Sequence, residues 1–161
     1  MRKAVLADAE SISEIHNLYI QNSTASFDLL SQTVADKTAW LQKHFDSDLP
    51  VLILQASDGL VLGYAALSFF QGGCSFRHTV ESTIYLRQGY SGKGFGKQLM
   101  KSLMTAAQDC GHHAIVALVC AENDAGIALA KSCGFNQCGL LKELAFKFDR
   151  WLDLIILQKV L

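Results

Sequence analysis

One acidic residue, Glu81, lies in a strand-like run just before a glycine loop that carries two lysines. The loop reads GKGFGK over residues 92–97 and leads into an amphipathic run. Because glycines lack a Cβ atom, several backbone N–H groups can converge on one anion at the N-terminal end of a helix. Lys93 and Lys97 add cationic donors. A carboxylate beside a phosphate cradle predicts an enzyme that binds a phosphorylated cofactor next to its own acid or base.

The glycine spacing disfavours two common phosphate loops. GKGFGK does not fit the dinucleotide fingerprint G-x-G-x-x-G, and no acidic residue ends a second strand about 20 residues later. A P-loop requires serine or threonine after its lysine, whereas Gln98 follows Lys97. A nicotinamide cofactor and the hydrolysis of ATP or GTP are therefore not expected. A loop that uses glycine only to bend the chain stays open as an alternative.

Hydrophobic periodicity predicts the elements that position this segment. Thr33 and Asp36 match a capping box, as do Ser11 and Glu14. We expect strands at 3–6, 51–57, 60–70, 79–86, 114–120, 137–148 and 151–161, and helices at 8–22, 33–46, 95–110 and 125–133. Asp58 and Gly59 form a turn signal, so the strands at 51–57 and 60–70 are expected to pair as an antiparallel hairpin. The strands on either side of the 95–110 helix are parallel. This is an α/β fold with a mixed central sheet in a single domain, residues 1–161.

The composition limits the partners and the compartment. The chain has 161 residues, 50% of them hydrophobic, and a formal net charge of −1 without a long basic run. Nucleic acid and anionic membranes are therefore not expected as partners. No signal-peptide core or apolar run of about 20 residues is present. The five cysteines are scattered and odd in number, which disfavours a disulfide framework or a metal site. We expect a soluble cytoplasmic protein.

Several motifs in order resemble one family. SGKGFGKQLMKSLM resembles the pyrophosphate loop and helix of the GNAT superfamily of N-acetyltransferases, and NDAGIALAKSCGF resembles a later helix of that superfamily. FRHTVESTIYL, AEND and KFDRWLD are similar to the phosphinothricin and methionine sulfoximine N-acetyltransferase family over nearly the whole chain. The resemblance implies acetyl-CoA as the donor, a homodimer, the acyl-CoA N-acyltransferase fold with its parallel strand pair splayed around the cofactor, and phosphinothricin-like or methionine-derived acceptors.

The resemblance also implies roles for individual residues. Glu81 aligns with the family's general base. The backbone of Ile84, Tyr85 and Leu86 would hold the acetyl arm, and Asn123 would reach the pantetheine or the departing thiol, although it could also simply cap a helix. The pyrophosphate would lie on the loop residues Gly92, Lys93, Gly94, Phe95, Gly96 and Lys97.

The acceptor pocket is less clearly marked in the sequence. Arg77 matches a family arginine that could pair with an acid group, and Phe27, Phe76 and Trp151 are candidates for an apolar wall. The chain departs from the superfamily at two positions: the loop starts with Ser91 instead of glutamine or arginine, and Ala130 replaces a tyrosine that protonates the thiolate. Two readings stay open besides the first: acetylation of another small amine or a protein N-terminus, and a non-catalytic acyl-CoA sensor.

Overall fold

The computed structural model describes residues 1–161 and contains one seven-stranded mixed sheet in the order β1-β2-β3-β4-β5-β7-β6. The strands are β1 (Arg2–Lys3), β2 (Val51–Gln55), β3 (Val61–Phe69), β4 (Thr79–Leu86), β5 (Ala114–Cys120), β6 (Asn136–Lys147) and β7 (Arg150–Val160). Only β4 and β5 are parallel, and all other neighbours are antiparallel. The expected mixed sheet is confirmed. The last strand, β7, lies between β5 and β6, so the C-terminal hairpin forms one end of the sheet with β6 at its edge.

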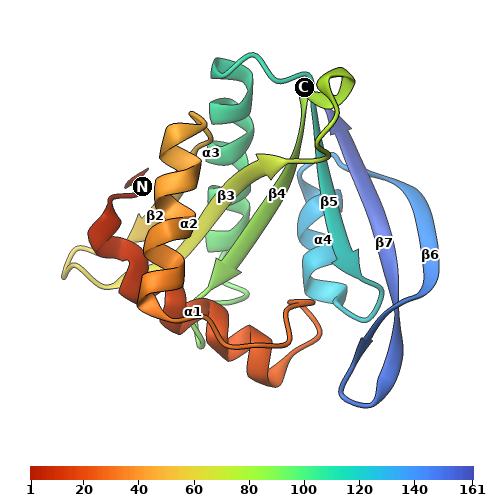
Figure 1. The fold of residues 1–161 in the computed structure, drawn as a ribbon, viewed down its shortest axis with the longest axis horizontal. Coiled ribbons are helices and arrows are strands. Elements are labelled where there is room, and N and C mark those ends of the chain that lie inside the picture. The colour runs from red at the N-terminus through yellow and green to blue at the C-terminus, as the bar shows by residue number, and fades with distance from the viewer.

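Four α-helices cover the two faces of the sheet (Figure 1). They are α1 (Ala9–Asn22), α2 (Val34–Asp46), α3 (Phe95–Asp109) and α4 (Asp124–Ser132). On β2, Val51 and Ile53 pack with α1 and α2, whereas the alternate residues Leu52 and Leu54 pack with α3. This alternation follows from the two-residue period of a strand. The sheet therefore separates two apolar cores, and none of the helices combines the length and apolar content that crossing a bilayer requires.

Short-range signals locate several elements correctly. Thr33 accepts the Asp36 N–H at 3.1 Å and the Asp36 carboxylate accepts the Thr33 N–H at 2.8 Å, so the expected capping box at α2 is confirmed. The 56–60 turn closes the β2–β3 hairpin, with Gly59 at φ +92°. That left-handed conformation favours glycine.

The N-terminus corrects two expectations. The first strand ends at Lys3, and a 3₁₀ turn at Leu6–Asp8 leads into α1. Ser11 lies inside α1, so the expected capping box with Glu14 is wrong. The physical reason is the Asp8 carboxylate, which accepts bonds from the Arg2 guanidinium at 2.6 and 2.7 Å and from the backbone N–H of Val5 at 2.8 Å. These contacts start the helical turn before Ser11 is reached.

Candidate active site

The parallel strands β4 and β5 separate shortly after they begin to pair. Only Thr79, Val80 and Glu81 of β4 have partners on β5. Beyond this point the two strands diverge, and a cavity of about 940 Å³ opens between them. Its walls include residues 81–86 of β4 and 117–119 of β5, together with residues of the glycine loop, α4, α1, α2 and the 23–32 loop. The cavity therefore connects the two faces of the sheet.

Glu81 lies at the last paired position before the strands separate, opposite Val116 on one side and Ser68 on the other. Its side chain is half-buried, has no hydrogen-bond or ion-pair partner in the structure, and lines the cavity. Burial raises the pKa of the Glu81 carboxyl above its usual range. A carboxylate of this kind is a stronger base than an exposed one, which is the property a general base needs.

The backbone of β4 presents unpaired donors where the strands diverge. Arg87 donates its N–H to the Leu62 carbonyl, and antiparallel pairing alternates along a strand. The odd-numbered residues of β4 therefore bond to β3, whereas the N–H groups of Ile84 and Leu86 are directed toward the diverging β5. The Leu86 carbonyl on that side accepts the Tyr19 hydroxyl at 2.9 Å. The two N–H groups can thus bind a carbonyl oxygen or an extended chain in the cavity.

The glycine loop leads into an uncapped helix. Gly92 and Gly94 have φ values of +77° and +82°, and a Cβ at either residue would meet no atom within 4 Å. Gly94 is the N-cap of α3, no side chain bonds to the first N–H groups, and the first turn contains no acidic residue. These groups are therefore open to an anion in front of the helix. Gly92, Gly94, Gly96 and Lys97 line the cavity, whereas Lys93 lies over the Tyr90 ring and Phe95 packs on the core.

Asn123 is the N-cap of α4 and lines the cavity. Its Oδ1 accepts the N–H of Gly126 at 3.0 Å. The side-chain carbonyl is thus used by the helix, while the amide NH₂ has no hydrogen-bond partner in the structure. Ser91 and Ala130, the two positions that depart from the superfamily pattern, also line the cavity. Ala130 presents only a methyl group there, so it supplies no proton.

The expected acceptor residues are divided between the cavity and the surface. Phe27 lines the cavity. Phe76 and Arg77 lie outside it in and after a 3₁₀ turn, and the Arg77 Nε donates to His78 at 3.0 Å. Trp151 is 59% exposed and packs against Phe146 on the C-terminal hairpin. The structure therefore brings Phe27 together with Glu81, the β4 backbone, the loop and Asn123, but not the other three.

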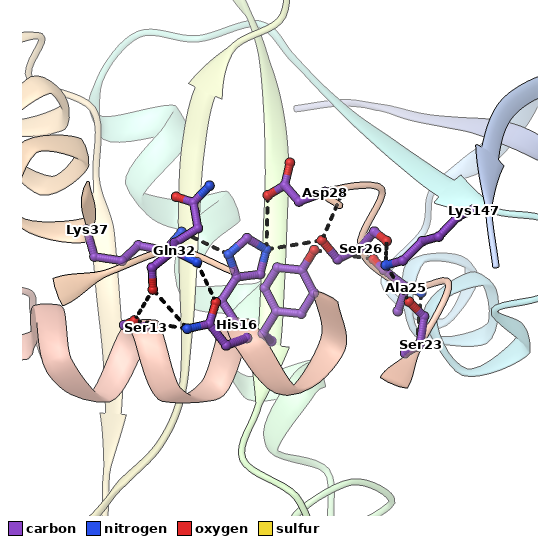
Figure 2. Close-up of polar contacts among 11 residues, drawn as sticks. Ser13, His16, Ser23, Ala25, Ser26, Asp28, Gln32, Lys37 and Lys147 are labelled. Atoms are coloured by element: carbon purple, nitrogen blue, oxygen red, sulfur yellow. Dashed lines mark hydrogen bonds and ion pairs between the residues drawn. The ribbon is translucent and has the colours of Figure 1, made fainter. Parts of the chain in front are cut away.

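Two buried basic side chains that were not expected from the sequence lie at the α1–α2 end of the cavity (Figure 2). The Lys37 Nζ is 2.8 Å from His16 Nδ1, and His16 Nε2 is 3.2 Å from the Ser26 hydroxyl. Burial and the neighbouring Lys37 lower the pKa of His16 to about 4. Both residues lie in the apolar stripes of their helices, and that polar interruption is the signal that could have identified them.

No group of three or more His, Cys, Asp or Glu side chains could hold a metal ion. The arrangement instead combines a half-buried base, backbone donors for an oxyanion and an anion cradle. These are the requirements for acyl transfer from a phosphorylated thioester.

Comparisons with known proteins agree with this geometry. The model of the acetyltransferase (GNAT) family matches residues 12–135. An L-methionine sulfoximine/L-methionine sulfone acetyltransferase of Pseudomonas paraeruginosa is 35% identical over 98% of this chain and 92% of that protein. An L-amino acid N-acyltransferase of Escherichia coli is 34% identical over 98% of this chain and 91% of that protein.

A solved structure shares the fold over the same length. The phosphinothricin acetyltransferase of Sinorhizobium meliloti, determined in complex with acetyl-CoA, superimposes with a TM-score of 0.96 at 32% identity and covers 99% of this chain and 86% of that one. The family model spans more than half of the chain, and these relatives extend over nearly all of it. The chain therefore belongs to the GNAT family and is an N-acetyltransferase.

Proposed function

We propose that the protein transfers the acetyl group of acetyl-CoA to the α-amine of phosphinothricin-like or methionine-derived amino acids such as the sulfoximine and the sulfone. The observation that carries this proposal is the cavity between β4 and β5, which joins the uncapped start of α3 to the half-buried Glu81. The acceptor class rests on the relatives whose names include methionine sulfoximine, methionine sulfone and phosphinothricin.

Each part of the site has a separate role in the proposed reaction. Glu81 accepts the proton that the ammonium of the acceptor loses, directly or through a water, so that the neutral amine can form the new C–N bond. The N–H groups of Ile84 and Leu86 hold the carbonyl oxygen as it gains negative charge. The loop from Gly92 to Lys97 and the N-terminus of α3 hold the pyrophosphate. The C–S bond then breaks, and the nitrogen releases its second proton to water or to the departing sulfur. Because Ala130 supplies no proton, the thiolate leaves as such or takes one from water.

The cofactor fits the residues that are present. The open space above Gly92 and Gly94 would be reduced by any Cβ atom at these positions, and both glycines have φ values that other residues rarely adopt. The amide of Asn123 lies in the same cavity and can donate to the pantetheine while its carbonyl caps α4.

We also propose that the protein is cytoplasmic and forms a homodimer. All five cysteines are free, which suits a reducing compartment. The C-terminal hairpin exposes a cluster of large apolar side chains, namely Leu140, Leu141, Leu144, Phe146, Phe148 and Trp151. Light scattering of the purified protein tests the second proposal, and a monomer at all concentrations would contradict it.

The function is tested with a panel of acceptors. Purified protein is incubated with acetyl-CoA and phosphinothricin, methionine sulfone, methionine sulfoximine, an unrelated amine or a peptide with a free N-terminus, and release of the CoA thiol is followed. The proposal predicts release with the first three. Release only with the amine or the peptide would contradict the acceptor class, and tight acetyl-CoA binding without any release would support a sensor.

A further inference from the structure

Lys37 of α2 is a buried cation in the cavity without an acidic partner. Only 3% of the residue is exposed, and no carboxylate lies within 4 Å of its Nζ. The Nζ lies 5.1 Å from the centre of the Trp40 ring, which offsets part of the cost of burial. Lysine is almost never fully buried unless it is paired. The missing partner is therefore an unusual feature of this cavity.

His16 of α1 holds the Lys37 ammonium in place. The pKa of His16 is lowered to about 4, so the ring is neutral at pH 7 and its Nδ1 accepts a bond from Lys37. The Nε2–H is then directed to the Ser26 hydroxyl at 3.2 Å and lies 3.6 Å from Asp28 Oδ2. An ammonium has three N–H donors, and His16 takes one. The other two have no partner in the protein.

A second buried lysine, Lys147, has a structural role and serves as a comparison. Lys147 of β6 is 4% exposed and also has no carboxylate partner. Its Nζ donates to the backbone carbonyls of Ser23 and Ser26 at 2.8 and 2.6 Å (Figure 2). Lys147 does not line the cavity. The protein thus uses Lys147 to fix the 23–28 loop. Lys37 lines the cavity and is not used in this way.

Lys37 contributes a basic group and Glu81 an acidic group to the cavity, whose lining also includes Asp28 and Lys97. Lys37 and Glu81 both line it. Tyr85 lies on the same face of β4 as Glu81, and its ring packs against the His16 ring with centroids 4.8 Å apart. Glu81 faces the amine in the proposed reaction. A zwitterionic acceptor carries an anionic group beyond that amine. Arg77, the other cation considered for this group, lies outside the cavity.

We propose that Lys37, positioned by His16, binds an oxyanion of the acceptor amino acid. This inference rests on the proposed function, because it concerns the acceptor of the same reaction. The oxyanion is either the α-carboxylate or an acidic group at the end of the side chain, such as a phosphinate. The two sources share the chemistry of a charge-assisted hydrogen bond to a buried ammonium.

Four acceptors distinguish these sources. Phosphinothricin carries both anionic groups, its α-carboxamide carries only the phosphinate, methionine sulfone carries only the carboxylate, and methionine sulfone amide carries neither. The variant is Lys37→Met, and the matched control is Lys43→Met, an exposed lysine on the same helix. For each acceptor, kcat/KM is compared with that of the unmodified protein, and its dissociation constant is measured by calorimetry with CoA present.

Lys37→Met is expected to lower kcat/KM and affinity about 10- to 100-fold for the acceptors that carry the bound oxyanion. The acceptor without an oxyanion should be unaffected. Lys43→Met should change none of the four, and Lys37→Arg, which keeps the cation, should retain much of the selectivity. If the loss occurs only with acceptors that carry the α-carboxylate, or only with those that carry the phosphinate, that group is the one that Lys37 binds. Equal losses for all four acceptors, or no loss for any, would overturn the inference.

The calorimetry separates this inference from the proposed function. If the unmodified protein binds the acidic acceptors more tightly than the neutral amide but acetylates none of them, the proposed function fails and the Lys37 site stands. If it acetylates all four equally well, without discrimination by charge, the proposed function stands and the Lys37 site fails even without a variant. Failure to bind any of the four would contradict both.

Discussion

Acidification should destabilise the fold through His16. Its pKa is lowered from 6.5 to about 4, first by burial and then by the charge of Lys37. The folded protein therefore resists a proton that the unfolded chain binds readily. The stability that neutral His16 allows is fully present above pH 6.5 and is lost as the pH falls toward 4.

The size of the effect follows from the change in pKa. One pKa unit corresponds to about 1.4 kcal/mol, so the full effect is about 3 kcal/mol. About 2 kcal/mol of it falls between pH 7 and pH 5, where most carboxylates stay charged. Because His16 is only 6% exposed, solvent screening reduces this value little.

The measurement is the free energy of unfolding in urea at several values between pH 7 and pH 5. The control is His16→Gln, whose neutral amide can accept from Lys37 and donate to Ser26 but cannot titrate. The difference in pH dependence between the two proteins isolates His16 from the other histidines. Lys37→Met removes the charge that helps to lower the His16 pKa, so it should reduce the loss of unfolding free energy on acidification.

The proposed role of His16 would be refuted if the unmodified protein and His16→Gln lost the same free energy of unfolding between pH 7 and pH 5. It would also be refuted if Lys37→Met left the pH dependence of the unmodified protein unchanged, because Lys37 would then not act on the His16 ring.

Three further predictions concern the proposed reaction. Glu81→Gln should lower kcat roughly 10²- to 10⁴-fold. Because burial raises the Glu81 pKa and disfavours its charged form, the free energy of unfolding at pH 7 should not fall. A fall would mean that the activity was lost through unfolding. Gly94→Ala should raise the KM for acetyl-CoA, since the left-handed backbone costs alanine about 1–2 kcal/mol and its Cβ projects into the cradle. The control Gly59→Ala carries the same backbone strain in a remote hairpin. An equal rise in KM there would contradict the assignment of Gly94 to the pyrophosphate cradle. Asn123→Asp keeps the cap oxygen for α4 but loses the amide donor, so it should weaken acetyl-CoA binding at unchanged melting temperature; unchanged binding would leave Asn123 as a cap alone.

Local signals in the sequence were sufficient for much of the fold. The Thr33–Asp36 capping box and the Asp58–Gly59 turn each depend on a few adjacent residues, so they could be predicted. Ser11–Glu14 has the same pattern but fails, since Asp8 is held by Arg2 and Val5 one turn earlier. The insertion of β7 beside β5 could not be predicted, because it depends on which strand edges are free once the sheet has formed.

In the candidate site, too, residues close in the sequence could be predicted to lie together, whereas contacts between distant residues could not. Glu81 and the glycine loop lie in one continuous segment, so their proximity follows from the chain itself. His16 and Lys37 come from two helices and meet only after these have packed on the sheet. Arg77 is a candidate because it matches a family arginine and Trp151 because of its aromatic side chain, but the direction of both side chains depends on turn and hairpin geometry that the sequence does not display.

The proposed reaction is direct transfer of acetyl from acetyl-CoA to the α-amine. Its most direct test uses acetyl-CoA labelled with ¹³C in the acetyl group and methionine sulfone as the acceptor. NMR of the product and mass spectrometry of the intact protein then locate the label. Direct transfer predicts label on the α-nitrogen of the amino acid, no labelled protein, and loss of the product in Glu81→Gln. Label on the protein, or CoA release without an N-acetyl product, would contradict it.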